Sequence, residues 1–126
     1  MKIESIRTFI IDKVFKDVID TLNSLREDYL IPVSISRCEL RIILNEFYNY
    51  YEKKQIQYHY IEMMTGHFED IAISAIESNS IVDSNFILNQ LQLFELLDSP
   101  VEVNPKETKK LVNSISKKIE RRPRLV

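Results

Sequence analysis

Residues Ser84 to Pro100 read SNFILNQLQLFELLDSP, and this stretch decides the fold class that the sequence predicts. Its apolar residues cover nearly every side of a helix: Phe86, Ile87, Leu88, Leu91, Leu93, Phe94, Leu96 and Leu97. A helix that is apolar all round is expected to be buried on all sides. We therefore predict a buried central helix near residues 84–98, with the other elements packed around it.

The chain around this helix has the size and composition of one globular domain, spanning residues 1–126. It is 44% hydrophobic and 29% charged, which is typical of folded proteins. No run approaches the ~18 apolar residues of a membrane span, and Glu4 and Arg7 interrupt the region where a signal peptide would be apolar. The single cysteine, Cys38, fits a reducing compartment. We expect a cytoplasmic protein of a bacterial or host cell, with Cys38 as a structural thiol.

Two helices are predicted in the first half of the chain. From Lys2 to about Tyr29, apolar residues recur every three or four positions over seven turns, and Pro32 disfavours helix at the residue before it. The tetrapeptide Ser36-Arg37-Cys38-Glu39 has the spacing of a capping box. A second helix should begin there and end near residues 53–54, unless it continues to Met64.

The middle of the chain is ambiguous. In residues 55–63, QIQYHYIEM, the apolar positions fit a strand by alternation and a helix by three-to-four spacing. We favour helix, because no partner strand is evident. Gly66, the only glycine, predicts a break followed by a shorter helix from about His67 to Ser78. One glycine also excludes glycine-rich phosphate loops and dinucleotide fingerprints.

A basic helix is predicted near the C-terminus. Asn104-Pro105-Lys106-Glu107 combines a capping residue, a proline suited to the first helical position, and a glutamate three residues after the cap. This helix should span residues 105–120, with a frayed tail over residues 121–126. The sequence thus predicts an all-α, single-domain bundle of about five helices.

Charge is divided unevenly along the chain, although the formal net charge is only −2. Residues 1–100 hold nine Lys or Arg against sixteen Asp or Glu, while residues 101–126 hold eight against three. The basic residues are candidate contacts for an acidic protein or for nucleic-acid phosphates: Lys109, Lys110, Lys117, Lys118, Arg121, Arg122 and Arg124. The alternative is that they complement the helix dipole or dock on the acidic body of the same protein.

Tyrosines at positions 48, 50, 51, 58 and 60 point in several directions from one helix, so some are expected at the surface. Tyrosine is enriched in protein interfaces. We predict Tyr48, Tyr58 and Met64 as partner contacts. The alternative, in which the rings line the core with their hydroxyls at its edge, stays open.

A cluster of metal-ligand residue types lies within twelve residues, and zinc accepts such nitrogen and oxygen atoms: His59, Glu62, His67, Glu69 and Asp70. There is no HExxH motif, and Thr65-Gly66 separates the two histidine-acid pairs. We predict no metal, cofactor or catalytic residue, and the sequence leaves open whether the pairs converge.

The pentapeptide Gln90-Leu91-Gln92-Leu93-Phe94 resembles the short motif with which proteins bind the bacterial sliding clamp, usually Gln-Leu-Ser/Asp-Leu-Phe. Gln92 is the one departure from that form. The resemblance covers five residues and implies an extended or partly turned peptide, with leucine and phenylalanine in a pocket of the clamp. In a buried helix the same side chains belong to the core, and packing favours that interpretation.

We therefore predict a small non-enzymatic, regulatory protein of bacterial or phage type that acts by occupying the surface of a partner protein. Nucleic-acid binding through the C-terminal helix is the alternative, and clamp binding through Gln90–Phe94 is a lesser one. A homodimer is also expected to be accessible, because several large apolar stripes exceed what one small core hides. The eighteen isoleucines and two alanines are typical of A/T-rich coding sequences, which suggests the bacterial or phage origin.

Overall fold

The computed structural model describes residues 3–98 and 105–121, without the side chains of residues 3–5, 94–98 and 105. The described chain is helical apart from short connections, which confirms the predicted all-α bundle. The helices are α1 (Ile3–Asp28), α2 (Arg37–Lys53), α3 (Tyr60–Ser78), α4 (Ser84–Asp98) and α5 (Pro105–Arg121). A 3-10 turn, η1 (Gln57–His59), and two short strands, β1 (Val33–Ser34) and β2 (Val82–Asp83), lie between them. No described helix is both long and apolar enough to cross a membrane.

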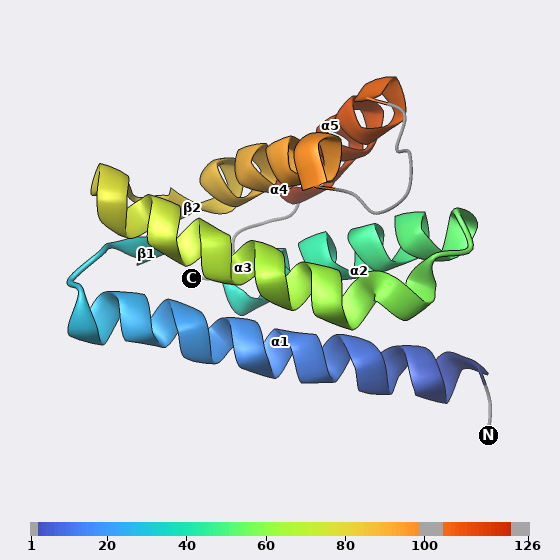
Figure 1. Ribbon diagram of the computed structural model, residues 1–126, viewed down its shortest axis with the longest axis horizontal. Coiled ribbons are helices and arrows are strands. Elements are labelled where there is room, and N and C mark those ends of the chain that lie inside the picture. Colours follow the sequence, from blue (N-terminus) through green and yellow to red (C-terminus); the bar gives the residue numbers. More distant parts are fainter. Residues whose placement is uncertain (1–2, 99–104, 122–126) are drawn as a thin grey trace.

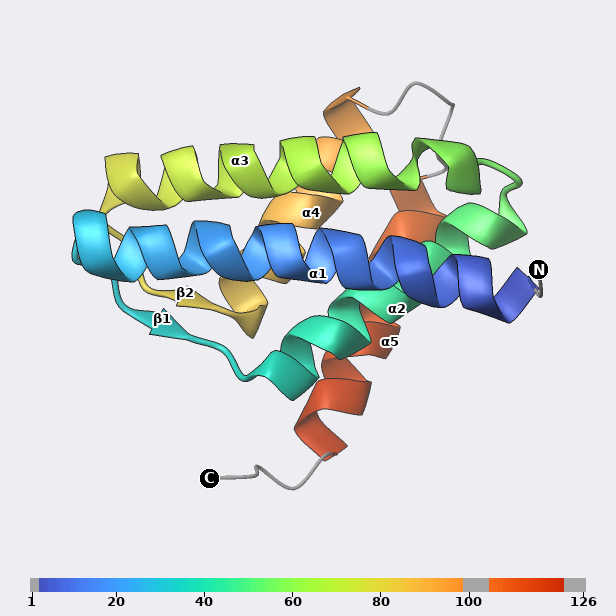
Figure 2. The ribbon, with the colours of Figure 1, turned by 90° about the horizontal axis from the view of Figure 1, so that it is seen from below.

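The five helices form a closed ring around one core. In ring order they are α1, α3, α4, α5 and α2, each packed on the next. Helix α1 runs along one side of the molecule, and α4 and α5 cover the opposite side (Figure 1). Helices α3 and α5 are therefore not adjacent in the ring, and Figure 2 shows α5 crossing behind α2 at a steep angle to α3, with its C-terminal end at the edge away from α3. Their outer faces point to different sides.

Among the described side chains, α2 has more buried residues than α4. Seven of its residues are buried: Leu40, Ile43, Leu44, Phe47, Tyr48, Tyr50 and Tyr51. Among the described side chains of α4, Ile87, Leu88 and Leu91 are buried, whereas Leu93 is 46% exposed. Helix α4 thus belongs to the bundle as predicted, but the expectation of burial on all sides is wrong, because a ring position leaves each helix one outer face.

The predicted capping box is present and also joins two helices. Ser36 Oγ accepts from the backbone nitrogen of Glu39 at 3.0 Å, and the Glu39 carboxylate accepts from the backbone nitrogen of Ser36 at 3.2 Å. The second carboxylate oxygen of Glu39 accepts from Ser84 Oγ at 2.9 Å. One side chain therefore ties the first turn of α2 to the first residue of α4.

The strands pair two connections that lie far apart in sequence. β1 and β2 run parallel, with Val33 opposite Val82, and the Val82 nitrogen donates to the Pro32 carbonyl oxygen at 2.9 Å. Asp83 Oδ1 then accepts from the Phe86 nitrogen at 2.8 Å, which caps α4. The α1–α2 link is thereby fixed against the α3–α4 link.

Positive backbone φ angles mark the helix ends, and none of them belongs to a glycine. Leu30, Gln55 and Asn79 have φ of 55°, 60° and 50°. The single glycine, Gly66, lies inside α3, so the predicted break at Gly66 and a separate helix from His67 are wrong. Burial of Met64, Phe68 and Ile71 on both sides of Gly66 outweighs the ~1 kcal/mol that a glycine costs a helix. The preference for helix over strand in residues 55–63 is confirmed, with a break at Gln55.

Replacing Gln55 with glycine is expected to raise the free energy of unfolding by about 1 kcal/mol. The end of α2 is a Schellman motif, in which Ile56 N donates to Tyr51 O at 2.9 Å and Gln55 N donates to Glu52 O at 3.0 Å. Gln55 holds the left-handed position that glycine adopts without steric cost. Urea denaturation measures the change. Gln57→Gly in the following 3-10 turn is the matched control and should lower the stability, and a loss in Gln55→Gly would contradict the prediction.

Candidate partner-binding surface

Helix α5 lies against α2 and α4 through an apolar face of regular spacing. Val112 and Ile115 are buried, and Leu111 and Ile119 are partly buried. Thr108 is also fully buried, and its hydroxyl oxygen lies 3.5 Å from the Tyr50 hydroxyl oxygen. These positions repeat every three or four residues, so they occupy one side of the helix and leave the opposite side to solvent.

Two ion pairs join the flanks of α5 to α2, on either side of the apolar face that sets the rotation of the helix. Lys54 pairs with Glu107 at the start of α5, and Lys118 pairs with Glu46 near its end. The hydrogen bond between Lys54 and Glu107 raises the pKa of Lys54 and lowers that of Glu107. Lys118 thus docks on the acidic body of its own chain, which is the alternative that the sequence left open for these lysines.

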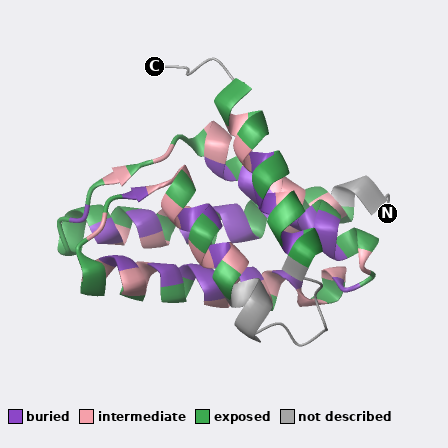
Figure 3. Cartoon of the chain, turned by 90° about the horizontal axis from the view of Figure 1, so that it is seen from above, coloured by how far each residue is buried: buried purple, intermediate pink, exposed green. Residues whose placement is uncertain are grey.

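The remaining cations of α5 form a line on its outer face, which we call the basic stripe. It consists of Lys106, Lys109, Lys110, Lys117 and Arg121, all exposed, with exposed Asn113 and Ser114 between them. In the described part of the chain no ion pair is recorded for Lys110, Lys117 or Arg121. Figure 3 shows this face of α5 exposed along the helix. The stripe presents mainly positive charge and side-chain hydrogen-bond donors to solvent, with the exposed carboxylate of Glu120 on the same side as Asn113.

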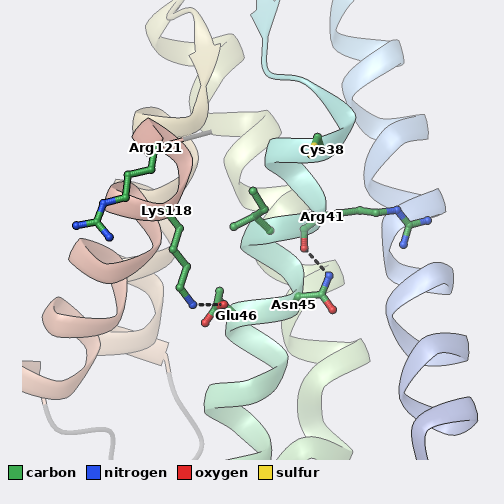
Figure 4. A pocket seen from close by; sticks show the side chains of 7 residues that line it. Cys38, Arg41, Asn45, Glu46, Lys118 and Arg121 are labelled. Carbon is green, nitrogen blue, oxygen red and sulfur yellow. Dashed lines mark hydrogen bonds and ion pairs between the residues drawn. The ribbon is translucent and has the colours of Figure 1, made fainter. Parts of the chain in front are cut away.

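An open groove lies beside the basic stripe, between α5 and α2 (Figure 4). Its lining comprises Cys38, Arg41, Ile42, Asn45, Glu46, Lys118 and Arg121. Arg41 points away from it toward α1, where its guanidinium is 2.8 Å from Asp12 and 4.2 Å from the centre of the Phe15 ring. The lining of the groove is mixed, with apolar Ile42 beside polar and charged side chains.

The structure places two of the three predicted contact residues of the central region in the core. Tyr48 is 4% exposed and Met64 is 0% exposed, so neither reaches a partner. Only Tyr58 is at the surface, 74% exposed, with its ring 4.2 Å from that of His59. Tyr48 and Met64 are therefore wrong as contacts, because the Tyr48 ring is covered by Tyr60 and Arg7 and Met64 belongs to the core.

The buried tyrosines form an edge-to-face cluster instead. The Tyr60 ring centre lies 5.1 Å from that of Tyr48 and 5.8 Å from that of Tyr51, and the Tyr60 hydroxyl donates to the Leu44 carbonyl at 3.0 Å. Burial strongly raises the pKa of Tyr60. Burial, and after it the Glu52 carboxylate, raises the pKa of Tyr48, while the Arg7 guanidinium over its ring lowers it.

The histidines and their acidic neighbours do not converge. His67 is buried at 4% exposure, whereas Asp70, three residues further along α3, is exposed to solvent, and Glu69 is exposed on the opposite side of the helix. His59 lies in η1, before the first residue of α3. Over residues 3–98 and 105–121, no group of three or more His, Cys, Asp or Glu side chains is placed to hold a metal ion.

The segment that resembles the clamp motif is helical within α4. Leu91 is fully buried, and Leu93 is partly exposed. The side chain of Phe94 lies outside the described residues, as do Arg122, Arg124 and the tail from residue 122 onward. Arg121, which the sequence assigns to the tail, is the last residue of α5. Comparison of the chain with protein families, curated proteins and solved structures gave no match.

Proposed function

We propose that this protein is a non-enzymatic binding protein that docks an acidic surface of a partner protein on the basic stripe of α5. The observation that supports this most is the position of the stripe on α5 opposite the face that packs into the core through Val112 and Ile115. Complementary charge attracts a partner surface and sets its register, and because the helix backbone is already ordered, binding has to order only the side chains. A regulatory role by occupying the partner, in a cytoplasm of bacterial or phage-infected type, is part of the proposal.

Reversing two charges of the stripe, Lys110→Glu with Lys117→Glu, is expected to weaken partner capture about tenfold or more, because each reversal replaces an attraction with a repulsion. Affinity capture from a lysate of the source cell, quantified by mass spectrometry, measures the change. Lys13→Glu with Lys16→Glu on the exposed side of α1 is the matched control with the same net charge. A partner captured equally by both variants would rule out the basic stripe as the contact.

Nucleic-acid binding is the second candidate, favoured by one detail of the stripe. Asn113 and Ser114 lie between Lys110 and Lys117, and such side chains donate to phosphate oxygens beside Lys and Arg contacts. Fluorescence anisotropy with a labelled DNA duplex tests it. Three phosphate contacts give a slope of log affinity against log salt of about −3. Binding that is equally strong at all salt concentrations excludes this candidate.

A further inference from the structure

The outer face of α3 carries charge opposite to that of α5. Along this face Glu62, Glu69, Asp70 and Glu77 are exposed, and α3 contains no lysine or arginine. We call these four residues the acidic stripe. Across the described part of the chain no ion pair is recorded for any of them. The acidic stripe is an unpartnered helix face.

The two stripes match in length and in the interval between charges. Glu62 to Glu77 and Lys106 to Arg121 each span the same number of residues, which is roughly 22 Å of helix. In the acidic stripe the charges recur seven residues apart, at Glu62 and Glu69 and again at Asp70 and Glu77, and Lys110 and Lys117 have the same interval. Residues seven apart return to nearly the same side of a helix, so Lys110 and Lys117 of one molecule can lie opposite one of the two acidic pairs of another.

The stripes of one molecule cannot meet each other. Helices α3 and α5 are not adjacent in the ring, their exposed faces point to different sides, and α5 crosses at a steep angle to α3 (Figure 2). Contact between a basic and an acidic stripe therefore needs two molecules. Such a contact is heterologous, because each molecule contributes a different surface, and it repeats from one molecule to the next.

Gly66 lies within the acidic stripe and has no packing role inside the molecule. A methyl group at its Cα would meet no atom within 4 Å, although glycine costs a helix about 1 kcal/mol relative to alanine. It is the only glycine of the chain, and even the three left-handed helix ends lack one. A glycine on an outer helix face allows the backbone of another molecule to approach closely.

We propose that the acidic stripe of α3 binds a second copy of this chain through that copy's basic stripe, so that molecules associate head to tail. The inference rests on the proposed function in one respect: it uses the same basic stripe of α5 and identifies the acidic stripe of a second copy as the surface that binds there. Complementary charge, equal length and the equal seven-residue interval favour a second copy over an unrelated basic protein. Exposed ion pairs are individually weak, so the association is reversible and sensitive to salt.

Sedimentation velocity of the full chain tests this inference. At about 10 mM salt, where the Debye length is ~30 Å, the mean mass of the wild-type protein should rise with concentration beyond twice the 14.9 kDa of one chain. At about 1 M salt it should fall to that of one chain. The proposal is overturned if the wild-type protein stays monomeric at low salt up to a protein concentration of about 1 mM. Such a result would mean that the binding free energy is weaker than ~4 kcal/mol.

Two neutralising variants give the sharper experiment. Lys110→Gln with Lys117→Gln disables the basic stripe, and Glu69→Gln with Glu77→Gln disables the acidic one. Each variant alone should remain monomeric, whereas an equal mixture should form a dimer and stop there, because only one working stripe of each sign remains. A mixture that stays monomeric, or one variant that associates as the wild type does, overturns the proposal.

A third variant, Gly66→Gln, tests the close approach without changing any charge. This variant should keep the helical circular dichroism signal and weaken self-association at least fivefold. Unchanged self-association would overturn the role of Gly66.

Partner capture separates this inference from the proposed function. Glu69→Gln with Glu77→Gln should still capture an acidic partner, because α5 is intact, so loss of self-association alone leaves the proposed function standing.

Discussion

Replacing Tyr60 with alanine should lower the free energy of unfolding by about 4 kcal/mol, a large part of the 5–15 kcal/mol typical of small domains. Tyr60 is the first residue of α3 and is 0% exposed. Its ring packs edge-to-face against Tyr48 and Tyr51 of α2. Truncation removes these contacts and leaves a cavity between the two helices. Urea denaturation followed by circular dichroism measures the loss.

Two further variants show which part of Tyr60 matters. Tyr60→Phe keeps the ring and removes the hydrogen bond to the Leu44 carbonyl, so it should cost about 1 kcal/mol. Tyr58→Ala, at a residue that is 74% exposed, should change the stability by less than about 0.5 kcal/mol. A Tyr60→Ala loss no larger than that of Tyr58→Ala would contradict the central position of this ring.

Alkaline pH should unfold the protein, and Tyr60 should account for a defined share of the effect. Burial raises the pKa of Tyr60 above its ordinary value of 10.0, so the folded state holds the phenolic proton more tightly than the unfolded state. The contribution is fully present below pH 10 and declines as the pH rises above it. One such proton lowers the free energy of unfolding by about 1.4 kcal/mol per pH unit.

Urea denaturation between about pH 9 and pH 11.5 measures this slope. Tyr60→Phe has no phenolic proton, so its stability should fall less steeply above pH 10, with the difference approaching 1.4 kcal/mol per pH unit. Tyr48, whose pKa is also raised by burial, is present in both proteins, and its charge adds to the raised pKa of Tyr60. If the free energy of unfolding falls equally steeply with pH in the wild type and in Tyr60→Phe, the prediction is contradicted, because Tyr60 then ionises as easily in the folded state as in the unfolded state.

Local signals in the sequence are sufficient for most of the helices. The end of α1 at Asp28 and the start of α2 after Ser36 follow from Pro32 and from the capping box, which act within a few residues. The pairing of Val33 with Val82 has no such signal, because two-residue strands carry no periodicity. Gly66 misled the prediction, since propensity is a weak prior where neighbouring side chains are buried.

The candidate site could be predicted in composition but not in geometry. The uneven charge identified the basic residues of α5, and helical spacing places Lys110 and Lys117 on one face. That Lys118 instead pairs with Glu46 depends on a contact between residues far apart in sequence. Tyr48 was predicted at the surface because a helical wheel does not tell how many neighbours surround a helix. The acidic stripe of α3 was hidden by the break assigned to Gly66, which divided one face between two expected helices.

Glu39 makes the beginnings of two helices interdependent. Its two carboxylate oxygens accept from the backbone nitrogen of Ser36 and from the hydroxyl of Ser84, and the strand pair lies beside both. If α4 were to unwind at its first turn, Glu39 would lose the Ser84 hydroxyl, which helps to orient the Glu39 carboxylate toward the backbone nitrogen of Ser36. Opening of either helix from this corner therefore weakens the other, so this end of the bundle should fray as one cooperative unit rather than helix by helix.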